Sequence, residues 1–275
     1  MSDSAVIEPQ DGAIGVRVLQ ITDTHLFAHP DRTLLGINTR DSFNAVLEAI
    51  MAENREVDFV LVTGDISQDY SAESYQYFAK RIALLGKKVF FLPGNHDDGP
   101  LMYRLFAPLG VNTERHIIAG SWQFVCLNSQ VYGVPHGWIG HEQMEYLKNV
   151  CSEYQHLNTA VCVHHLPRLV DSAWLDTQTM HNQDEFNRLL YTLPDLRLVL
   201  CGHVHQNFDL THRGLRYMAT PSTSIQFLPQ SNEFMLDTCA PGWRYLTFRS
   251  DGTVDTELHR LAEGSFLPDL NSRGY

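Results

Sequence analysis

Short groups of Asp, Asn and His recur along this chain, and each group follows an apolar run. The groups are Asp23-Thr24-His25, Gly64-Asp65, Gly94-Asn95-His96-Asp97, His164-His165 and Gly202-His203-Val204-His205. Mixed carboxylate, amide and imidazole ligands suit divalent metals such as iron, manganese or zinc better than calcium or magnesium. The recurrence of these groups therefore predicts a metal site that several distant parts of the chain build together.

The apolar runs before these groups have the character of buried parallel strands. They are Val16–Ile21, Phe59–Thr63, Val89–Leu92, Thr159–Val163 and Leu196–Cys201. Short runs rich in branched residues and bounded by Gly or Pro are typical of parallel strands that are covered on both faces. In open α/β sheets the carboxyl ends of such strands line the ligand crevice. We therefore expect all the groups to meet in one place.

The spacing inside the groups predicts two metal ions. Residues two apart in an extended backbone point to the same side, so Asp23 and His25 could grip one ion together, and His203 and His205 form a second such pair. Asp65 has two carboxylate oxygens and could bridge two ions. Two ions ~3.5–4 Å apart can clamp a phosphate, activate a bridging hydroxide and stabilise the leaving oxygen. The candidate metal ligands are Asp23, His25, Asp65, Asn95, His164, His203 and His205.

Each group taken alone also has an ordinary structural interpretation. Gly-Asp is common turn chemistry, and an Asp-x-His pair can be a turn aspartate beside a surface histidine. One histidine of the last group could be a hydrogen-bonded core residue. The shared position after strands and the order of the groups favour the metal site. His165 is expected to lie beside the site without being a ligand, because neighbouring strand residues face opposite ways.

The rest of the chain alternates helical and strand patterns and then becomes antiparallel. Apolar residues at helical spacing predict helices near Thr39–Asn54, with Thr39 as N-cap, and near Ser71–Leu84, with Ser71 as N-cap. Further helices are expected near Pro100–Ala107, Gly140–Tyr154 and Gln183–Tyr191, and hairpins at Asn207–Thr211 with Leu215–Ala219 and at Tyr245–Arg249 with Thr253–His259. We predict a single α/β domain over residues 1–275, with a C-terminal hairpin and tail from about residue 240.

Composition agrees with a cytoplasmic enzyme. The chain has 275 residues, 44% hydrophobic and 19% charged, and a formal net charge of -12. This charge disfavours nucleic acid and anionic membrane as partners, because both need a basic face. The sequence shows neither a signal-peptide pattern nor an apolar run of ~18 residues. Five scattered cysteines without a CxxC pair predict reduced thiols.

The order of the groups resembles the calcineurin-like metallophosphoesterase superfamily. More narrowly, the chain is similar to the bacterial class III cyclic-AMP phosphodiesterases (the Icc/CpdA group), from about Arg17 to the C-terminus. The closer resemblance is carried by Leu19-Gln20-Ile21-Thr22-Asp23-Thr24-His25-Leu26, Thr220-Pro221-Ser222-Thr223 and Ala240-Pro241-Gly242-Trp243-Arg244. It implies a four-layer αββα sandwich of the metallophosphoesterase type, with two metals at the strand ends.

The resemblance also implies a role for each site residue. Asp23, His25, Asp65 and His205 would hold the first metal, and Asp65, Asn95, His164 and His203 the second. The ions would be divalent or trivalent, with iron and/or manganese expected. His96 would contact the phosphate and protonate the leaving oxygen, and Asp97 would orient His96. The substrate nucleotide would touch His25, Asp65, Asn95, His96 and His205.

The implied activity is hydrolysis of 3',5'-cyclic AMP to 5'-AMP by a metal-bound hydroxide, with a small cyclic nucleotide as substrate. Three alternatives stay open: a diesterase or monoesterase for another small phosphate ester, a nuclease, and a non-catalytic scaffold of the same fold. Gln68 stands where many family phosphatases carry Asp, which weakens a protein-phosphatase interpretation. We expect Thr220–Phe227 and Cys239–Arg244 to wall the base, with Phe227 or Trp243 stacking on adenine, although a core role for Trp243 is equally expected.

Overall fold

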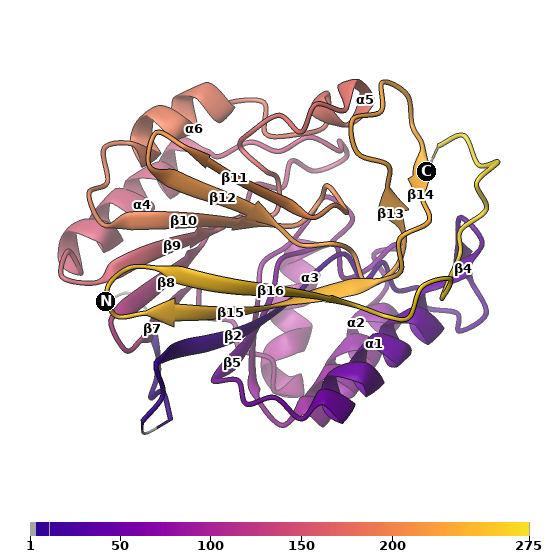
Figure 1. The fold of residues 1–275 in the computed structure, drawn as a ribbon, viewed down its shortest axis with the longest axis horizontal. Coiled ribbons are helices and arrows are strands. Elements are labelled where there is room, and N and C mark those ends of the chain that lie inside the picture. Colours follow the sequence, from indigo (N-terminus) through magenta and orange to yellow (C-terminus); the bar gives the residue numbers. More distant parts are fainter. Residues whose placement is uncertain (1–3, 11, 275) are drawn as a thin grey trace.

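Two large β-sheets lie at the centre of the fold, in a computed structural model that describes residues 4–10 and 12–274 (Figure 1). One sheet contains β2 (Gly15–Ile21), β5 (Phe59–Val62), β6 (Lys88–Phe91), β15 (Gly242–Arg249) and β16 (Val254–Arg260). The other contains β1 (Ser4–Ile7), β7 (His116–Ala119), β8 (Trp122–Cys126), β9 (Asn158–Cys162), β10 (Leu196–Cys201), β11 (Phe208–His212) and β12 (Leu215–Ala219). Their strand orders are β16-β15-β2-β5-β6 and β1-β7-β8-β9-β10-β12-β11.

Helices cover the outer face of each sheet. Those that pack with the five-stranded sheet are α1 (Thr39–Glu53), α2 (Ala72–Ile82) and α3 (Gly99–Phe106), with the 3₁₀ turns η1 (Ala83–Leu85) and η2 (Ala107–Leu109). Those that pack with the seven-stranded sheet are α4 (His141–Glu153), α5 (Ala173–Asp176) and α6 (Gln183–Leu190). Short ladders are formed by β3 (Thr33–Leu34) with β4 (Ile37–Asn38) and by β13 (Gln226–Phe227) with β14 (Leu236–Asp237).

Three apolar cores hold these layers together. Between the sheets, Phe59 and Phe124 lie edge to face at 5.1 Å, and Phe124 meets Phe248 at 4.7 Å. The two outer cores join each sheet to its helices, for example through Phe43 and Phe78, which stack at 5.6 Å. The order of layers is therefore helix, sheet, sheet, helix, as Figure 1 shows. The predicted four-layer α/β sandwich is confirmed.

The strands and helices follow the sequence patterns closely, with one difference at a helix start. The N-cap of α1 is Asn38, whose side chain accepts hydrogen bonds from the backbone of Arg40 and Asp41, and not Thr39 as predicted. Asn is a stronger N-cap than Thr, because its short amide oxygen reaches the free N–H groups of the first turn. Ser71 caps α2 as expected, through a bond from the Ser74 backbone.

The chain topology brings the predicted site together. β2, β5 and β6 pair in parallel, and so do β9 and β10, so the carboxyl ends of these strands lie at the same edge of their sheets. Both predicted hairpins are present, and β15 joins β2 in antiparallel pairing. All five cysteines are free thiols. Within residues 4–10 and 12–274, no helix has the length and apolar character needed to cross a membrane.

Candidate metal centre

The predicted ligands lie in loops at the carboxyl ends of strands from both sheets. Asp23, Asp65 and Asn95 follow β2, β5 and β6 of the five-stranded sheet, whereas His164 and His203 follow β9 and β10 of the seven-stranded sheet. Backbone hydrogen bonds join these loops, from Asp23 N to Gly64 O at 3.0 Å and from Gly202 N to His164 O at 3.1 Å. The centre therefore forms where the two sheets meet, and all seven predicted ligands are buried.

An unusual backbone positions most of these ligands. The residues with positive φ include Asp23 (54°), His25 (47°), Asp65 (51°), His203 (69°) and His205 (49°). A left-handed conformation costs a non-glycine residue about 1–3 kcal/mol, and such residues concentrate at functional sites. The prediction that the two i, i+2 pairs converge because their backbone is extended is therefore wrong. The paired side chains meet because tight turns direct them inward.

The first set of ligands is formed by His25, His205 and Asp23. The Nε2 atoms of His25 and His205 lie 3.1 Å apart, and His205 Nε2 lies 3.3 Å from Asp23 Oδ1. His205 Nδ1 donates to the Ile225 carbonyl at 2.9 Å. Since a carbonyl only accepts, His205 Nδ1 carries the proton of this bond, and Nε2 faces the other two groups. Ring nitrogens and a carboxylate oxygen that converge at this distance fit a cation between them.

The second set is formed by His164, Asn95 and His203. Asn95 Oδ1 lies 3.2 Å from His164 Nε2 and 3.0 Å from His203 Nδ1. His164 Nδ1 donates to the Thr63 carbonyl at 2.7 Å, which turns the Nε2 lone pair towards the centre. A hydrogen bond from the ring to a backbone carbonyl is the usual way in which a protein orients a metal-binding imidazole.

Asp65 lies between the two sets. Its Oδ2 atom is 3.2 Å from His164 Nε2 and 3.9 Å from His25 Nε2, and it is buried without a hydrogen-bond partner. Its Oδ1 atom accepts a bond from the His96 backbone at 2.8 Å. His203 Nε2 is likewise buried without a partner. Unsatisfied buried polar atoms are rare and costly, so their presence here fits a site built for an additional ligand.

The electrostatics of the centre favour a cation. Burial and neighbouring groups lower the pKa of His25 and of His203 to about 3, so these rings are neutral and can donate lone pairs. Burial also opposes a charge on His164, but Asp65 and Asp23 outweigh it and raise the pKa of His164 to about 9. The negative potential that favours a proton there equally favours a metal ion, because metals and protons compete for the same lone pair.

The distances fit a metal at each set. Ligand atoms ~2.1 Å from one ion lie roughly 3.0–4.2 Å from each other, depending on the coordination geometry. The separations between ligand atoms in the two sets run from 3.0 Å to 3.9 Å. Two groups made only of these side chains, Asp23-His25-His205 and Asp23-Asp65-His164, are compact enough to hold an ion, and two further compact groups add His96 or His165. The residues present therefore fit a metal centre.

Residue 94 lies so close to Asp65 that only a glycine fits there. A Cβ at Gly94 would collide with the Asp65 carboxylate and lie 2.5 Å from the Asp65 backbone nitrogen. We expect Gly94→Ala to weaken metal affinity by roughly 10- to 100-fold, the usual scale for a residue that supports a ligand. Metal titration by calorimetry checks this. Gly140→Ala is the control, since a Cβ at Gly140 meets open space; equal affinities in both variants would contradict the assigned position of Asp65.

His96 lies at the rim of the centre. It is partly exposed, and its ring meets His25 edge to face at 5.1 Å. The expectation that Asp97 orients this ring is not supported. The Asp97 carboxylate accepts hydrogen bonds from the backbone of Gly94, Ile66 and Ser67 and from the Tyr75 hydroxyl. Asp97 is therefore a positioning residue that fixes the loops carrying Asp65 and Asn95, because a buried carboxylate must satisfy its acceptors where donors converge.

His165 is hydrogen-bonded away from the centre. Its Nδ1 is 2.7 Å from the Ser129 hydroxyl, and its Nε2 is 3.1 Å from the Pro135 carbonyl. Because Nε2 must donate to a carbonyl, Nδ1 accepts from Ser129. Both ring nitrogens are thus used, and the prediction that His165 lies beside the site without being a ligand agrees with this geometry.

The sequence did not predict the supporting roles of Gln68 and Phe227. Gln68 Oε1 lies 2.6 Å from His25 Nδ1 and orients that ring. Phe227 stacks on His205, with ring centroids 4.4 Å apart and planes at 13°. Phe227 and Trp243 are each 1% exposed, so the expectation that either stacks on adenine is wrong. The sequence carries no clear signal for Gln68 or Phe227, because neither a glutamine in a turn nor a single aromatic residue is typical of a metal centre.

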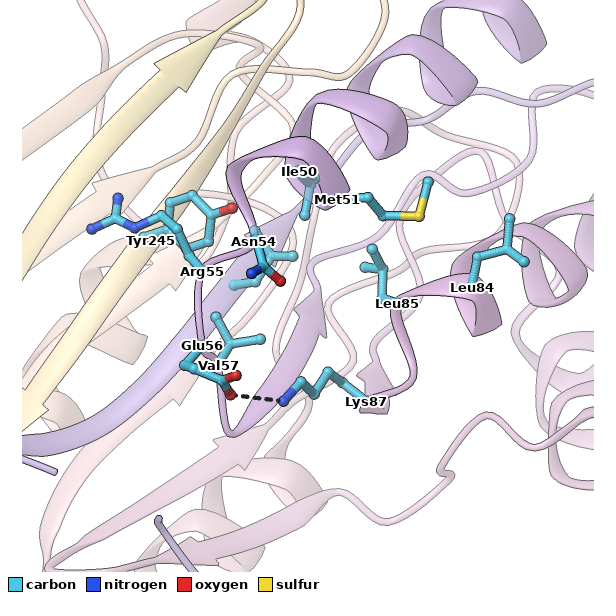
Figure 2. A pocket seen from close by; sticks show the side chains of 11 residues that line it. Ile50, Met51, Asn54, Arg55, Glu56, Val57, Leu84, Leu85, Lys87 and Tyr245 are labelled. Carbon is cyan, nitrogen blue, oxygen red and sulfur yellow. Dashed lines mark hydrogen bonds and ion pairs between the residues drawn. The ribbon is translucent and has the colours of Figure 1, made fainter. Parts of the chain in front are cut away.

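A separate pocket lies far from the ligands along the five-stranded sheet. Figure 2 shows Ile50, Met51, Leu84 and Leu85 beside the Glu56–Lys87 ion pair, which measures 3.3 Å. Val57 lies two residues before β5 and Lys87 directly precedes β6, so this pocket is at the amino ends of those strands. It lacks the histidines and clustered carboxylates of the metal centre. We therefore place the chemistry at the carboxyl ends.

Comparison with known sequences settles the family. The profile of the calcineurin-like phosphoesterases matches residues 16–207, which include every predicted ligand. The chain belongs to the calcineurin-like phosphoesterase family. Within this family it is 47% identical to the 3',5'-cyclic adenosine monophosphate phosphodiesterase CpdA of Vibrio vulnificus, over 94% of this chain and 95% of that protein. It is 44% identical to the CpdA of Escherichia coli K12, over 99% of this chain and 100% of the relative.

Solved structures of other proteins have a similar fold. A dimetal phosphatase from Danio rerio superposes with a TM-score of 0.64 at 15% identity, over 89% of this calcineurin-like phosphoesterase and 99% of the other chain. At that identity the similarity concerns the fold alone.

Proposed function

We propose that this calcineurin-like phosphoesterase hydrolyses 3',5'-cyclic AMP to 5'-AMP at a two-metal centre. Water adds across the bond between phosphorus and the 3'-oxygen, and the products are a 5'-phosphate and a free 3'-hydroxyl. The observation that carries the proposal is the match along nearly the whole chain to relatives named for this activity. The convergence of all seven candidate ligands on one buried centre supports it.

The residues of the chain have distinct tasks in this reaction. Asp23, His25, Asp65 and His205 would hold one ion, and Asp65, Asn95, His164 and His203 the other. Bound ions would supply a nucleophile derived from water and would neutralise charge on the phosphate. Without cations, the buried carboxylates of Asp23 and Asp65 would repel an anionic phosphate.

His96 is the group placed to act on the substrate directly. Its backbone is fixed by Asp65, and its partly exposed ring projects beside His25 at the rim. From there it would donate a hydrogen bond to the phosphate or to the departing 3'-oxygen, where charge develops. The nucleotide would also contact His25, Asp65, Asn95 and His205, whose side chains form the floor below it.

Iron and/or manganese are the metals that we propose for the centre. The donor set combines imidazole nitrogens with carboxylate and amide oxygens, and this mixture suits borderline divalent and trivalent ions. Metal analysis after reconstitution with iron, manganese, zinc and magnesium separately would test the assignment, and highest activity with magnesium would contradict it.

A substrate comparison tests the proposed preference for a small cyclic nucleotide. We expect kcat/KM for cyclic AMP to exceed that for single-stranded and duplex DNA by at least about 100-fold at low salt, because a net charge of -12 gives no attraction towards a polyanion. Efficient DNA cleavage with negligible turnover of cyclic AMP would overturn the substrate assignment. Failure to bind stoichiometric metal would instead favour a non-catalytic scaffold.

A further inference from the structure

A cleft opens directly beside the metal centre. Its volume is about 300 Å³, at the lower end of the roughly 300–1,000 Å³ typical of small-molecule sites. Asn95 and His96 form its inner end, so a group bound there would adjoin the phosphate position. The remaining lining residues are Tyr70, Gly133, Val134, Pro135 and Gln178. None of these five belongs to the ligand set of the two ions.

Tyr70 forms one side of the cleft. Its hydroxyl lies 3.5 Å from the Asn95 carbonyl, and the residue keeps 44% of its surface exposed. Its backbone is left-handed, with φ at 57°, which is a costly conformation for an aromatic residue. This conformation places an exposed aromatic side chain beside the loop that carries Asn95.

Two apolar residues also line the cleft. They are Val134 and Pro135, and the Pro135 carbonyl accepts the hydrogen bond from His165. The backbone of Gly137, two residues further along the chain, is also hydrogen-bonded. Gly137 N donates to Thr179 O at 3.2 Å, and His181 N donates to Gly137 O at 2.9 Å. These hydrogen bonds connect the segment that contains Val134 and Pro135 to the segment that contains Gln178. A flat ring bound in the cleft would adjoin the aromatic Tyr70 and the apolar Val134 and Pro135.

Gln178 supplies a side-chain amide to the lining of the cleft. Among the described residues its side-chain amide has no hydrogen-bond partner, whereas its backbone is fixed by Gln178 N donating to Leu175 O at 2.9 Å. An amide offers one donor and one acceptor side by side. Adenine presents the complementary pair, N6–H and N7, whereas guanine presents two acceptors, O6 and N7, on the same edge.

We propose that this cleft is the base subsite, in which Tyr70 stacks on the purine and Gln178 selects adenine over guanine. The inference rests on the proposed function, because it assigns the phosphate to the neighbouring metal centre. It replaces the buried Phe227 and Trp243 with an aromatic group that a substrate can reach. Stacking on an aromatic side chain is a common source of affinity for a nucleobase, and the amide adds selectivity.

The test is steady-state kinetics of the metal-loaded protein with four substrates. These are cyclic AMP, cyclic GMP, a ribose 3',5'-cyclic phosphate that lacks a base, and bis(p-nitrophenyl) phosphate. The variants are Tyr70→Ala, Tyr70→Phe and Gln178→Ala. Gln155→Ala is the matched control, because Gln155 is an exposed glutamine just before β9, at the opposite end of that strand from the metal centre.

We expect Tyr70→Ala to lower kcat/KM for cyclic AMP by roughly 10- to 100-fold, mainly through KM, with Tyr70→Phe close to wild type. Gln178→Ala should lower the preference for cyclic AMP over cyclic GMP by about 10-fold. Neither change should alter turnover of the baseless substrate, and Gln155→Ala should alter nothing.

Each other result has a separate meaning. If the wild type hydrolyses cyclic AMP but the Tyr70 and Gln178 variants keep its rate and selectivity, the base subsite is wrong and the proposed function stands. Equal losses with the baseless substrate would also overturn the subsite, since they would place Tyr70 or Gln178 in the metal chemistry. Cleavage of bis(p-nitrophenyl) phosphate without turnover of any cyclic nucleotide would overturn the proposed function itself.

Discussion

Asp65→Ala is expected to abolish turnover of cyclic AMP, with a loss of at least about 10⁴-fold, and to lower bound metal from about two ions per chain to one or fewer. Asp65 Oδ2 lies 3.9 Å from His25 Nε2 and 3.2 Å from His164 Nε2, so it faces a ligand of each ion. Asp23 Oδ1 is nearest to His205 Nε2, at 3.3 Å, and lies farther from His164 Nε2, at 4.0 Å. Its loss therefore damages both ion positions, whereas the loss of a ligand to one ion would spare the other. Activity assays combined with metal analysis of the same sample measure both effects.

The fold should survive this substitution. Burial raises the pKa of Asp97, and repulsion from Asp65 adds to the effect, so that this pKa reaches about 7; removing the Asp65 charge relieves that repulsion. Circular dichroism should therefore match that of the wild type. Asp41→Ala, which removes an exposed carboxylate on α1, is the control and should keep both ions. Two ions retained with substantial turnover in Asp65→Ala would refute the bridging role.

His96→Ala should retain both ions but lower kcat by roughly 10²–10⁴-fold, the usual range for one group that transfers a proton or stabilises charge. The backbone nitrogen of residue 96 still bonds Asp65 in this variant, so the ligand keeps its position. The ring that lies beside His25 is lost, and with it the hydrogen bond that we propose to the substrate. Metal analysis measures whether both ions are retained, and kinetics with cyclic AMP measures the loss in kcat.

His136→Ala is a suitable comparison for His96→Ala. His136 stacks on His181 at 3.6 Å, outside the ligand set, and its replacement should change kcat little. If His96→Ala loses metal, His96 is a ligand and its assigned role is incorrect.

Much of the fold was readable from the sequence because buried parallel strands are short and clearly bounded. β10 begins at Leu196 and ends at Cys201, as predicted, since a glycine follows it directly. Helix ends were less certain, as α1 shows. Both Asn38 and Thr39 carry a side chain that can cap, and only the three-dimensional path of the chain decides which one does.

The members of the site were predicted, but their arrangement was not. Residue type alone suggested Asp23 and His25 as ligands, yet their left-handed backbone depends on the neighbouring loop, to which Asp23 N bonds at Gly64 O and His25 N bonds at Asp65 O. The cleft beside the metal centre was missed because Tyr70 and Gln178, which line it, are far apart in sequence. Such contacts arise from tertiary packing, and no local pattern encodes them.

The central claim is tested most directly by following cyclic AMP with the metal-loaded protein and separating the products by chromatography. The account predicts 5'-AMP as the sole nucleotide product, with kcat/KM of at least about 10⁴ M⁻¹ s⁻¹, loss of activity on chelation and recovery when iron or manganese is returned. Formation of 3'-AMP, turnover that is insensitive to metal removal, or no turnover by protein holding two ions would contradict it.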